Sequence, residues 1–224
     1  MTIPFIDFHV TFLDMIDYIG TFAFAISGVR LSSTKKFDLF GAFVVGFVTA
    51  VGGGTIRDLF LGVTPFWMVQ PSYAIITFLS LITVIVFKKW IVRLNYTFFI
   101  FDAIGLALFT VVGFEKSMNA GNPTWINIIM GCITGAAGGV IRDVLINVVP
   151  LIFRKDIYAM ACIGGGFFYW LSMKMGLQTI ACEIIAAIAV LMIRILCVHY
   201  GIELPSLYTD DNSGQTRIRR GGGK

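Results

Sequence analysis

The sequence predicts an all-α membrane protein with seven transmembrane helices, built from two inverted three-helix repeats and a seventh helix. Three observations support this fold class. Of the 224 residues, 57% are hydrophobic and only 13% are charged, whereas about a quarter of a typical soluble domain is charged. Apolar runs recur along the chain between short polar segments. A glycine-rich motif also occurs twice, as GGTIRD at 53–58 and as GGVIRD at 138–143.

Seven apolar segments have the length expected of membrane-spanning helices, which need about 20 mostly apolar residues. Short linkers separate them, so we expect one transmembrane domain over residues 1–205. Residues 206–224 are polar and glycine-rich and are expected to form a disordered tail. The predicted spans are residues 10–29, 39–62, 72–87, 96–114, 125–148, 157–173 and 178–199.

The distribution of lysine and arginine predicts how the chain is oriented. With the N-terminus outside, the inside loops and the tail hold twelve basic residues, and the outside loops hold only Lys116 and Lys174. Because cytoplasmic loops carry the excess of lysine and arginine, we expect the N-terminus outside and the C-terminus in the cytoplasm. The net charge of +4 is explained by these loops, and no nucleic-acid partner is expected.

The two motif copies belong to a longer repeat with an offset of 85 residues. The same offset, without a gap, aligns Asp17 with Asp102 and Thr49 with Thr134. Each repeat holds three spans, so the second must enter the membrane from the opposite side, and a pseudo-two-fold axis in the membrane plane relates the two. The expected units are repeat one at about 10–87, repeat two at about 96–173, and helix seven at about 178–199.

The glycines are expected to break the second and fifth spans at equivalent positions. Discontinuous helices in matching positions of inverted repeats often mark a binding or permeation site. Unwound backbone exposes carbonyl oxygens that attract cations, and Thr49 and Thr134, one turn earlier, would add hydroxyl groups. The alternative is that the glycines only permit close helix packing. The expected break residues are Gly52, Gly53, Gly54, Gly138 and Gly139.

Charged residues accompany both motifs, and charges inside a membrane normally pair or line a water-filled path. At 1.5 Å per residue, Asp17 and Gly53 both lie about 20 Å from the inner membrane edge, in the outer half. The repeat places Asp102 and Gly138 at the matching depth in the inner half. We therefore expect one charged cluster in each half of the bilayer.

Pairing within these clusters follows from helix geometry. Neighbouring helical residues point about 100° apart and do not face each other. We therefore expect Asp17 to lie near Arg57, and Asp102 to lie near Arg142. The alternative to a pathway role is that these ion pairs only lock helices together. The carboxylates left free for the pathway or for partners in the other repeat are Asp58 and Asp143.

Other candidate sites are weaker. The sequence contains no nucleophile–base set, metal-ligand cluster or cofactor motif, so we expect no enzyme activity, no metal and no cofactor. Glu183, near the outer end of the seventh span, is expected to extend toward the headgroup region. Basic clusters near the inner edge could hold anionic lipid headgroups, although membrane orientation explains them as well. These residues are Lys35, Lys36, Lys88, Lys89 and Arg93.

The doubled motif, the three-helix repeat and the extra helix resemble the trimeric intracellular cation (TRIC) channels, specifically their prokaryotic homologues, over about residues 10–200. The resemblance implies a homotrimer in a prokaryotic inner membrane, with lipids at the subunit interfaces. Each protomer would hold its own pore for K⁺ and Na⁺ between kinked second and fifth helices. Related bacterial proteins that share the domain have been described as glycine transporters. A secondary transporter of a small amino acid is therefore the alternative, because an inverted repeat suits both functions.

Overall fold

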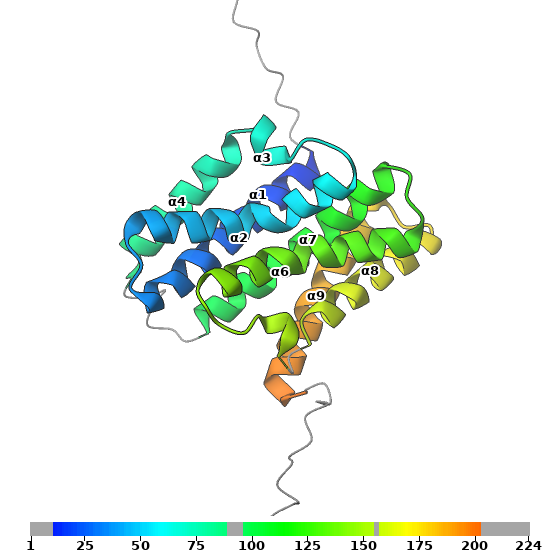
Figure 1. The fold of residues 1–224 in the computed structure, drawn as a ribbon. Helices are drawn as coiled ribbons and strands as arrows, with labels where there is room; N and C mark the ends of the chain where they lie inside the picture. The colour runs from blue at the N-terminus through cyan, green and yellow to red at the C-terminus, as the bar shows by residue number, and fades with distance from the viewer. Residues whose placement is uncertain (1–10, 89–95, 155–156, 203–224) are drawn as a thin grey trace, which may run out of the picture.

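The computed structural model describes residues 11–88, 96–154 and 157–202, and every regular element in these ranges is a helix (Figure 1). The long helices are α1 (Phe12–Ser32), α2 (Leu39–Phe60), α4 (Ser72–Val86), α6 (Thr97–Asn119), α7 (Thr124–Leu145), α8 (Ala159–Lys174) and α9 (Thr179–Tyr200). The short helices are η1 (Ser33–Lys35), α3 (Phe66–Val69) and η2 (Leu151–Phe153).

The seven long helices correspond in order to the seven predicted spans, which confirms the all-α membrane fold. Within the described ranges, five of them are long and apolar enough to cross a membrane. The helices α4 and α8 are shorter, with 15 and 16 residues. A short helix that the sequence did not predict precedes each of them, α3 before α4 and η2 before α8. The predicted tail at 206–224 lies outside the described residues.

The two repeats have the same elements and run in opposite directions. An offset of 85 residues places the bounds of α2 on those of α7. The contacts between α1 and α6 show the inversion directly, because Gly20 lies against Phe109 while Gly105 lies against Phe24. These two helices are therefore antiparallel. We call the side where α1 begins the N-terminal face and the side where α9 ends the C-terminal face.

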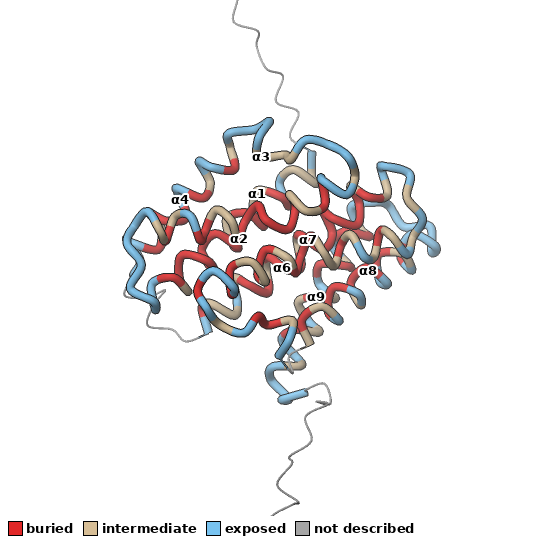
Figure 2. Tube along the Cα trace, in the orientation of Figure 1, coloured by how far each residue is buried: buried red, intermediate tan, exposed pale blue. Residues whose placement is uncertain are grey.

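Four helices form the centre of the protein. The principal contacts join α1 to α2, α6 to α7, α1 to α6, and α2 to α7, and most buried backbone follows these helices (Figure 2). In the first repeat α4 packs on α1 and α2, and in the second α8 packs on α6 and α7. The seventh helix, α9, packs on α6 and α8 and has no counterpart in the first repeat.

The helices α2 and α7 end in the same left-handed turn. Gly62 has a φ of 70° and its repeat equivalent Asn147 has a φ of 54°, a conformation that favours glycine and, less strongly, asparagine. The following N–H of Val63 donates to the carbonyl oxygen of Asp58 at 3.0 Å, and an equivalent bond closes α7. The aspartate of each motif is thereby fixed in the last turn of its helix.

The expected glycine breaks are wrong. Helical structure continues through Gly52–Gly54 in α2 and through Gly138 and Gly139 in α7. Polar backbone groups away from water must remain hydrogen-bonded, so an intact helix avoids the cost of exposed carbonyl groups. The alternative of close helix packing accounts for these glycines.

The close packing is a reciprocal contact between α2 and α7. A Cβ atom on Gly53 would collide with the carbonyl oxygen of Thr134, and one on Gly138 would collide with the carbonyl oxygen of Thr49. The two contacts are equivalent, because Gly138 and Thr134 lie 85 residues after Gly53 and Thr49. The backbones of the two helices therefore touch at the pseudo-two-fold axis, which only glycine permits.

Replacing Gly53 with alanine is expected to destabilise the protein, because the new methyl group would meet backbone of α7 rather than a flexible side chain. Overpacking costs about 1–3 kcal/mol, more than the roughly 1 kcal/mol by which alanine favours a helix over glycine. Gly52→Ala is the matched control, since a Cβ there would meet the flexible end of Ile141. Thermal unfolding of the purified protein in detergent measures the difference. Equal unfolding midpoints for the two variants would contradict the packing role.

Candidate functional site

Two buried clusters of charged and polar groups lie on opposite sides of the contact between α2 and α7. Each is assembled from both repeats, and each contains one copy of the Arg–Asp motif. The N-terminal cluster consists of Asp17, Arg57, Asp58, Phe66, Tyr73 and Lys116. The C-terminal cluster consists of Ser27, Asp102, Arg142, Asp143, Leu151 and Tyr158.

The motif arginine and aspartate pair with each other in both clusters. Nε of Arg57 donates to Oδ1 of Asp58 at 2.8 Å, and Nε of Arg142 donates to Oδ1 of Asp143 at 2.8 Å. The expectation that these aspartates stay free is wrong. The directions of adjacent helical positions do not prevent the contact, because the long arginine side chain folds back along the helix end.

The second oxygen of each motif aspartate holds the loop that follows the helix. Oδ2 of Asp58 accepts from the N–H of Phe66 at 2.9 Å, and Oδ2 of Asp143 accepts from the N–H of Leu151 at 3.0 Å. The left-handed turn after each helix brings the loop back to the carboxylate. Each aspartate therefore neutralises an arginine and anchors a loop at the same time.

In the C-terminal cluster, the predicted pairing of Asp102 with Arg142 is confirmed. Nη1 of Arg142 lies 2.5 Å from Oδ1 of Asp102 and donates to Oγ of Ser27 at 2.7 Å. Tyr158 places its hydroxyl group 3.5 Å from the same oxygen of Asp102. Because Ser27 belongs to α1, Arg142 connects the two repeats.

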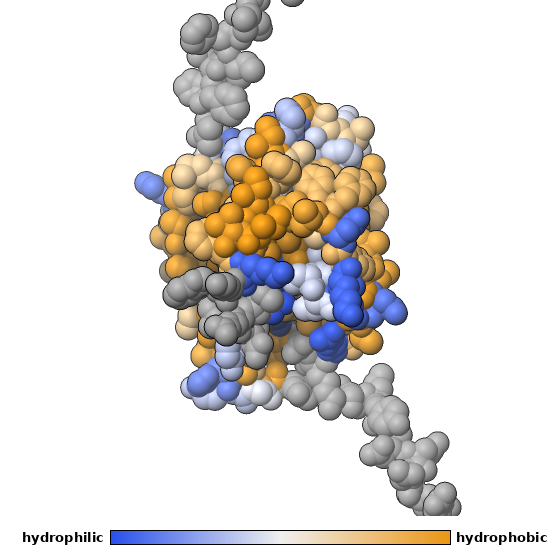
Figure 3. All heavy atoms as spheres, turned by 90° about the vertical axis from the view of Figure 1, so that its left-hand side faces the viewer, coloured by the Kyte–Doolittle hydropathy of each residue, from blue (hydrophilic) through white to orange (hydrophobic). Residues whose placement is uncertain are grey.

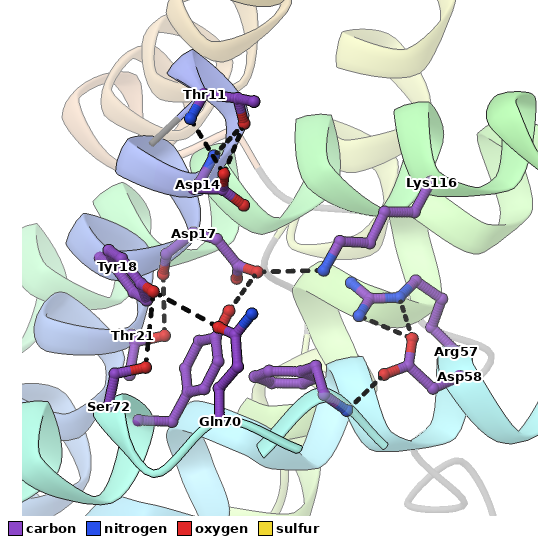
Figure 4. Close-up of polar contacts among 12 residues, drawn as sticks. Thr11, Asp14, Asp17, Tyr18, Thr21, Arg57, Asp58, Gln70, Ser72 and Lys116 are labelled. Carbon is purple, nitrogen blue, oxygen red and sulfur yellow. Dashed lines mark hydrogen bonds and ion pairs between the residues drawn. The ribbon is translucent and has the colours of Figure 1, made fainter. Parts of the chain in front are cut away.

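In the N-terminal cluster, Asp17 has a different partner from the predicted one. Nζ of Lys116 donates to Oδ2 of Asp17 at 3.1 Å (Figure 4). The hydroxyl of Tyr73 donates to the same oxygen at 3.0 Å. Arg57 belongs to the same cluster but bonds to Asp58. Asp17 and Arg57 thus belong to the same cluster but do not form the expected ion pair, because Lys116 reaches across from α6 and binds Asp17 instead.

Lys116 differs from the other charged groups in its access to solvent. Its side chain is 29% exposed, while the aspartates and arginines of both clusters are at most 5% exposed. Its ammonium group lies 5.3 Å from the centre of the Phe66 ring, and the Arg57 guanidinium lies 5.4 Å from it. Aromatic faces attract cations, so Phe66 stabilises both.

Sequence reasoning assigned Lys116 only to an outside loop. It ended the fourth span at residue 114, whereas α6 continues to Asn119. The additional helical turn directs Lys116 toward the protein interior. The residue at the equivalent position of the first repeat is Leu31. The repeat therefore does not predict a partly buried cation at Lys116.

A second missed cation is Arg194 on α9, which is 2% exposed. Its guanidinium lies 4.9 Å from the ring centre of Tyr158 and donates to the carbonyl oxygen of Ile157 at 3.2 Å. The seventh helix thus adds a positive charge beside the C-terminal cluster. An arginine within an otherwise apolar span was the available sequence signal.

The predicted threonines lie at the α2–α7 contact and are buried. Thr49 donates its hydroxyl to the carbonyl oxygen of Val45 at 2.6 Å, and Thr134 donates to that of Met130 at 2.6 Å. Both bonds stay within the residue's own helix. Their assignment to an ion pathway remains a prediction, as does that of the other predicted pathway residues.

Basic residues gather on the C-terminal face, where Lys35, Lys36 and Lys88 are exposed. Figure 3 shows hydrophilic side chains collected on this side beside a broad hydrophobic area. Lys36 and Lys88 border a cavity of about 330 Å³ between α1, α2 and α4. The expected lipid contact remains a prediction, and the other two predicted residues, Lys89 and Arg93, lie outside the described residues.

Within the described ranges, no group of three or more histidine, cysteine, aspartate or glutamate side chains could hold a metal ion.

A protein-family profile described as "Glycine transporter" matches the chain twice, over residues 14–89 and 99–174. The two matches have the offset of the internal repeat, so each repeat is one copy of the family's unit. Together they cover more than half of the chain.

Bacterial membrane proteins are similar over most of their length. A UPF0126 membrane protein of Vibrio cholerae serotype O1 is 39% identical over 196 residues, which cover 87% of this chain and 82% of that protein. The UPF0126 inner membrane protein YadS of Escherichia coli K12 is 39% identical over 208 residues, which cover 88% of this chain and 97% of that protein.

Solved structures of TRIC cation channels have the same fold. One structure from a study of conductance is 35% identical, with a TM-score of 0.80, and covers 89% of this chain and 99% of that chain. The TRIC trimeric intracellular cation channel orthologue from Rhodobacter sphaeroides is 32% identical, with a TM-score of 0.80. The match covers 84% of this chain and 98% of that chain.

Removing the charge of Asp102 is expected to destabilise the protein more than removing that of Asp17. Asp102→Asn deprives the fully buried Arg142 of one of its two carboxylates, and breaking a buried ion pair costs about 3–5 kcal/mol. In Asp17→Asn, the partly exposed Lys116 can turn to solvent, and exposed pairs contribute about 1 kcal/mol or less. Thermal unfolding in detergent compares these repeat equivalents. A larger loss for Asp17→Asn would contradict the difference in burial.

Proposed function

The chain belongs to the family of TRIC cation channels and related bacterial membrane proteins, and from this we propose that it is a channel for monovalent cations, K⁺ and Na⁺. The family match spans both repeats, and the similar solved structures are cation channels. We place one pathway in each protomer of a homotrimer, between α2 and α7 and through both charged clusters. The proposed role is transport across the membrane and not catalysis.

The contact between Asp17 and Lys116 supports this proposal most. A buried carboxylate and the hydroxyl of Tyr73 form an oxygen-rich site, and a positively charged ammonium group occupies it at 3.1 Å. The ammonium is tethered to a side chain that is 29% exposed. When Lys116 swings toward the N-terminal face, Asp17 is left with a negative charge that a permeating K⁺ can balance.

The C-terminal half supplies the equivalent carboxylate, Asp102, with the cation of Arg142 beside it. The same inverted unit therefore places a carboxylate toward each end of the proposed pathway. Ions entering from either side would meet equivalent groups, as expected for passive conduction in both directions.

We propose that the conformation described is closed. The backbone contacts of Gly53 and Gly138 leave no room between α2 and α7, and the cluster carboxylates are at most 5% exposed. Opening therefore requires α2 and α7 to separate at these contacts. The symmetric contact makes one rearrangement sufficient to open both halves.

A carrier for a small amino acid such as glycine is the second candidate. The N-terminal cluster presents both a carboxylate, Asp17, and a partly exposed ammonium, Lys116. This pair complements the opposite charges of a zwitterion. An inverted repeat also suits alternating access, in which the two halves open in turn.

We further propose a prokaryotic inner-membrane location, in line with the membrane and inner-membrane relatives. The lysine and arginine distribution supports an N-terminus outside and a C-terminus in the cytoplasm. The C-terminal face is then cytoplasmic, and its exposed lysines would contact anionic lipid headgroups.

Purified protein in planar lipid bilayers is expected to show unitary K⁺ currents without added amino acid, because a channel conducts down an electrochemical gradient. The same protein in liposomes is tested for exchange of labelled glycine. Saturable glycine exchange without unitary currents would contradict the proposed channel function and support a glycine carrier.

Lys116→Gln is expected to increase K⁺ conductance or open probability several-fold, because it removes the tethered cation from Asp17 and leaves the carboxylate to a permeating ion. Lys174→Gln is the matched control, since Lys174 is exposed on the same face and takes no part in the cluster. Single-channel recording measures both variants. Equal currents for the wild type and Lys116→Gln would assign Lys116 a structural role only.

A further inference from the structure

Two glutamates meet inside the protein, away from both charged clusters. Glu115 lies near the end of α6 and Glu183 near the start of α9, and they are 9% and 2% exposed. The expectation that Glu183 extends toward the headgroups is wrong, because its side chain packs inward. This contact involves the seventh helix, which the repeat does not duplicate.

The carboxyl groups face each other and one tyrosine. Glu115 and Glu183 are neighbours on the packed helices α6 and α9. Tyr169 of α8 lies beside both and donates to Oε2 of Glu115 at 3.3 Å. Oε2 of Glu183 is buried and has no hydrogen-bond partner. The surrounding wall is apolar, with Phe114 stacked on Tyr169 at 4.3 Å.

No ion pair in the described ranges involves either glutamate. By contrast, Asp17, Asp58, Asp102 and Asp143 each contact a lysine or arginine. The other titratable groups that face the glutamate pair are Tyr169 on α8 and Cys182 on α9 itself, and neither supplies a positive charge. Two ionised carboxylates here would repel each other in an apolar surrounding without compensation.

We propose that Glu115 and Glu183 bind one proton between them at neutral pH and form a proton-binding site that joins α9 to α6. A carboxylic acid donating to a carboxylate removes one of the two negative charges. The shared proton also supplies the partner that Oε2 of Glu183 lacks. The proton then belongs to the pair and not to either glutamate alone.

The position of the pair couples it to the proposed pathway. Glu115 directly precedes Lys116, whose ammonium group binds Asp17. Loss of the proton places like charges between α6 and α9 and pushes the end of α6 away from α9. This effect on conduction rests on the proposed channel function, whereas the proton site does not.

Infrared spectroscopy of the full chain in lipid vesicles tests the site. At neutral pH the wild type is expected to show one protonated carboxyl C=O band per chain, which disappears as the pH is raised. Glu183→Gln and Glu115→Gln should each abolish this band, because the remaining carboxylate then accepts from an amide. Tyr169→Phe is the matched control, which should keep the band and shift its frequency.

The wild-type spectrum needs no variant to fold, so one overturning result can be read without the variants. Absence of a protonated carboxyl band at neutral pH would overturn it, and so would a band that survives in both glutamine variants. A carboxylate stretch that responds to K⁺ or Ca²⁺ at neutral pH, without a protonated band, would assign a cation site instead. The channel recordings are independent of each of these results.

Discussion

The backbones of α2 and α7 touch where Gly53 lies against the carbonyl oxygen of Thr134 and Gly138 lies against that of Thr49. This reciprocal contact is the constraint on which the rest of the structure depends. It holds the two repeats together at their pseudo-two-fold axis and leaves no room for a side chain there. It also fixes the ends of α2 and α7, and thus the two Arg–Asp motifs, on opposite sides of the contact.

The charge arrangement follows from this geometry. Each motif arginine is buried and is neutralised by the next residue, while a second carboxylate, Asp17 or Asp102, comes from the neighbouring helix. The repeats differ in the cation that binds this second carboxylate. Arg142 binds Asp102 from within its own repeat, whereas Lys116 binds Asp17 from the other repeat and reaches solvent. The two halves therefore differ in how far the cation beside this second carboxylate is exposed to solvent.

Much of this architecture was readable in the sequence, because membrane spans and a fixed repeat offset leave strong patterns. The approximate positions of the spans, the inversion and the pairing of Asp102 with Arg142 were predicted correctly. The glycine breaks were wrong because glycine marks both kinks and close helix contacts, and only the partner helix distinguishes them. Lys116 was misplaced because α6 continues a turn beyond the predicted end of its span. Glu183 was misplaced because a position near a helix end does not show whether the side chain faces the headgroups or the interior.

We propose that conduction requires α2 and α7 to separate at the glycine contacts. Single-particle cryo-electron microscopy of the protein in lipid nanodiscs at high KCl tests this most directly. We expect a class of particles in which both contacts are open, with ion or water density beside Asp17 and Asp102. An ion-filled pathway elsewhere, such as between protomers, with both glycine contacts intact would contradict the claim.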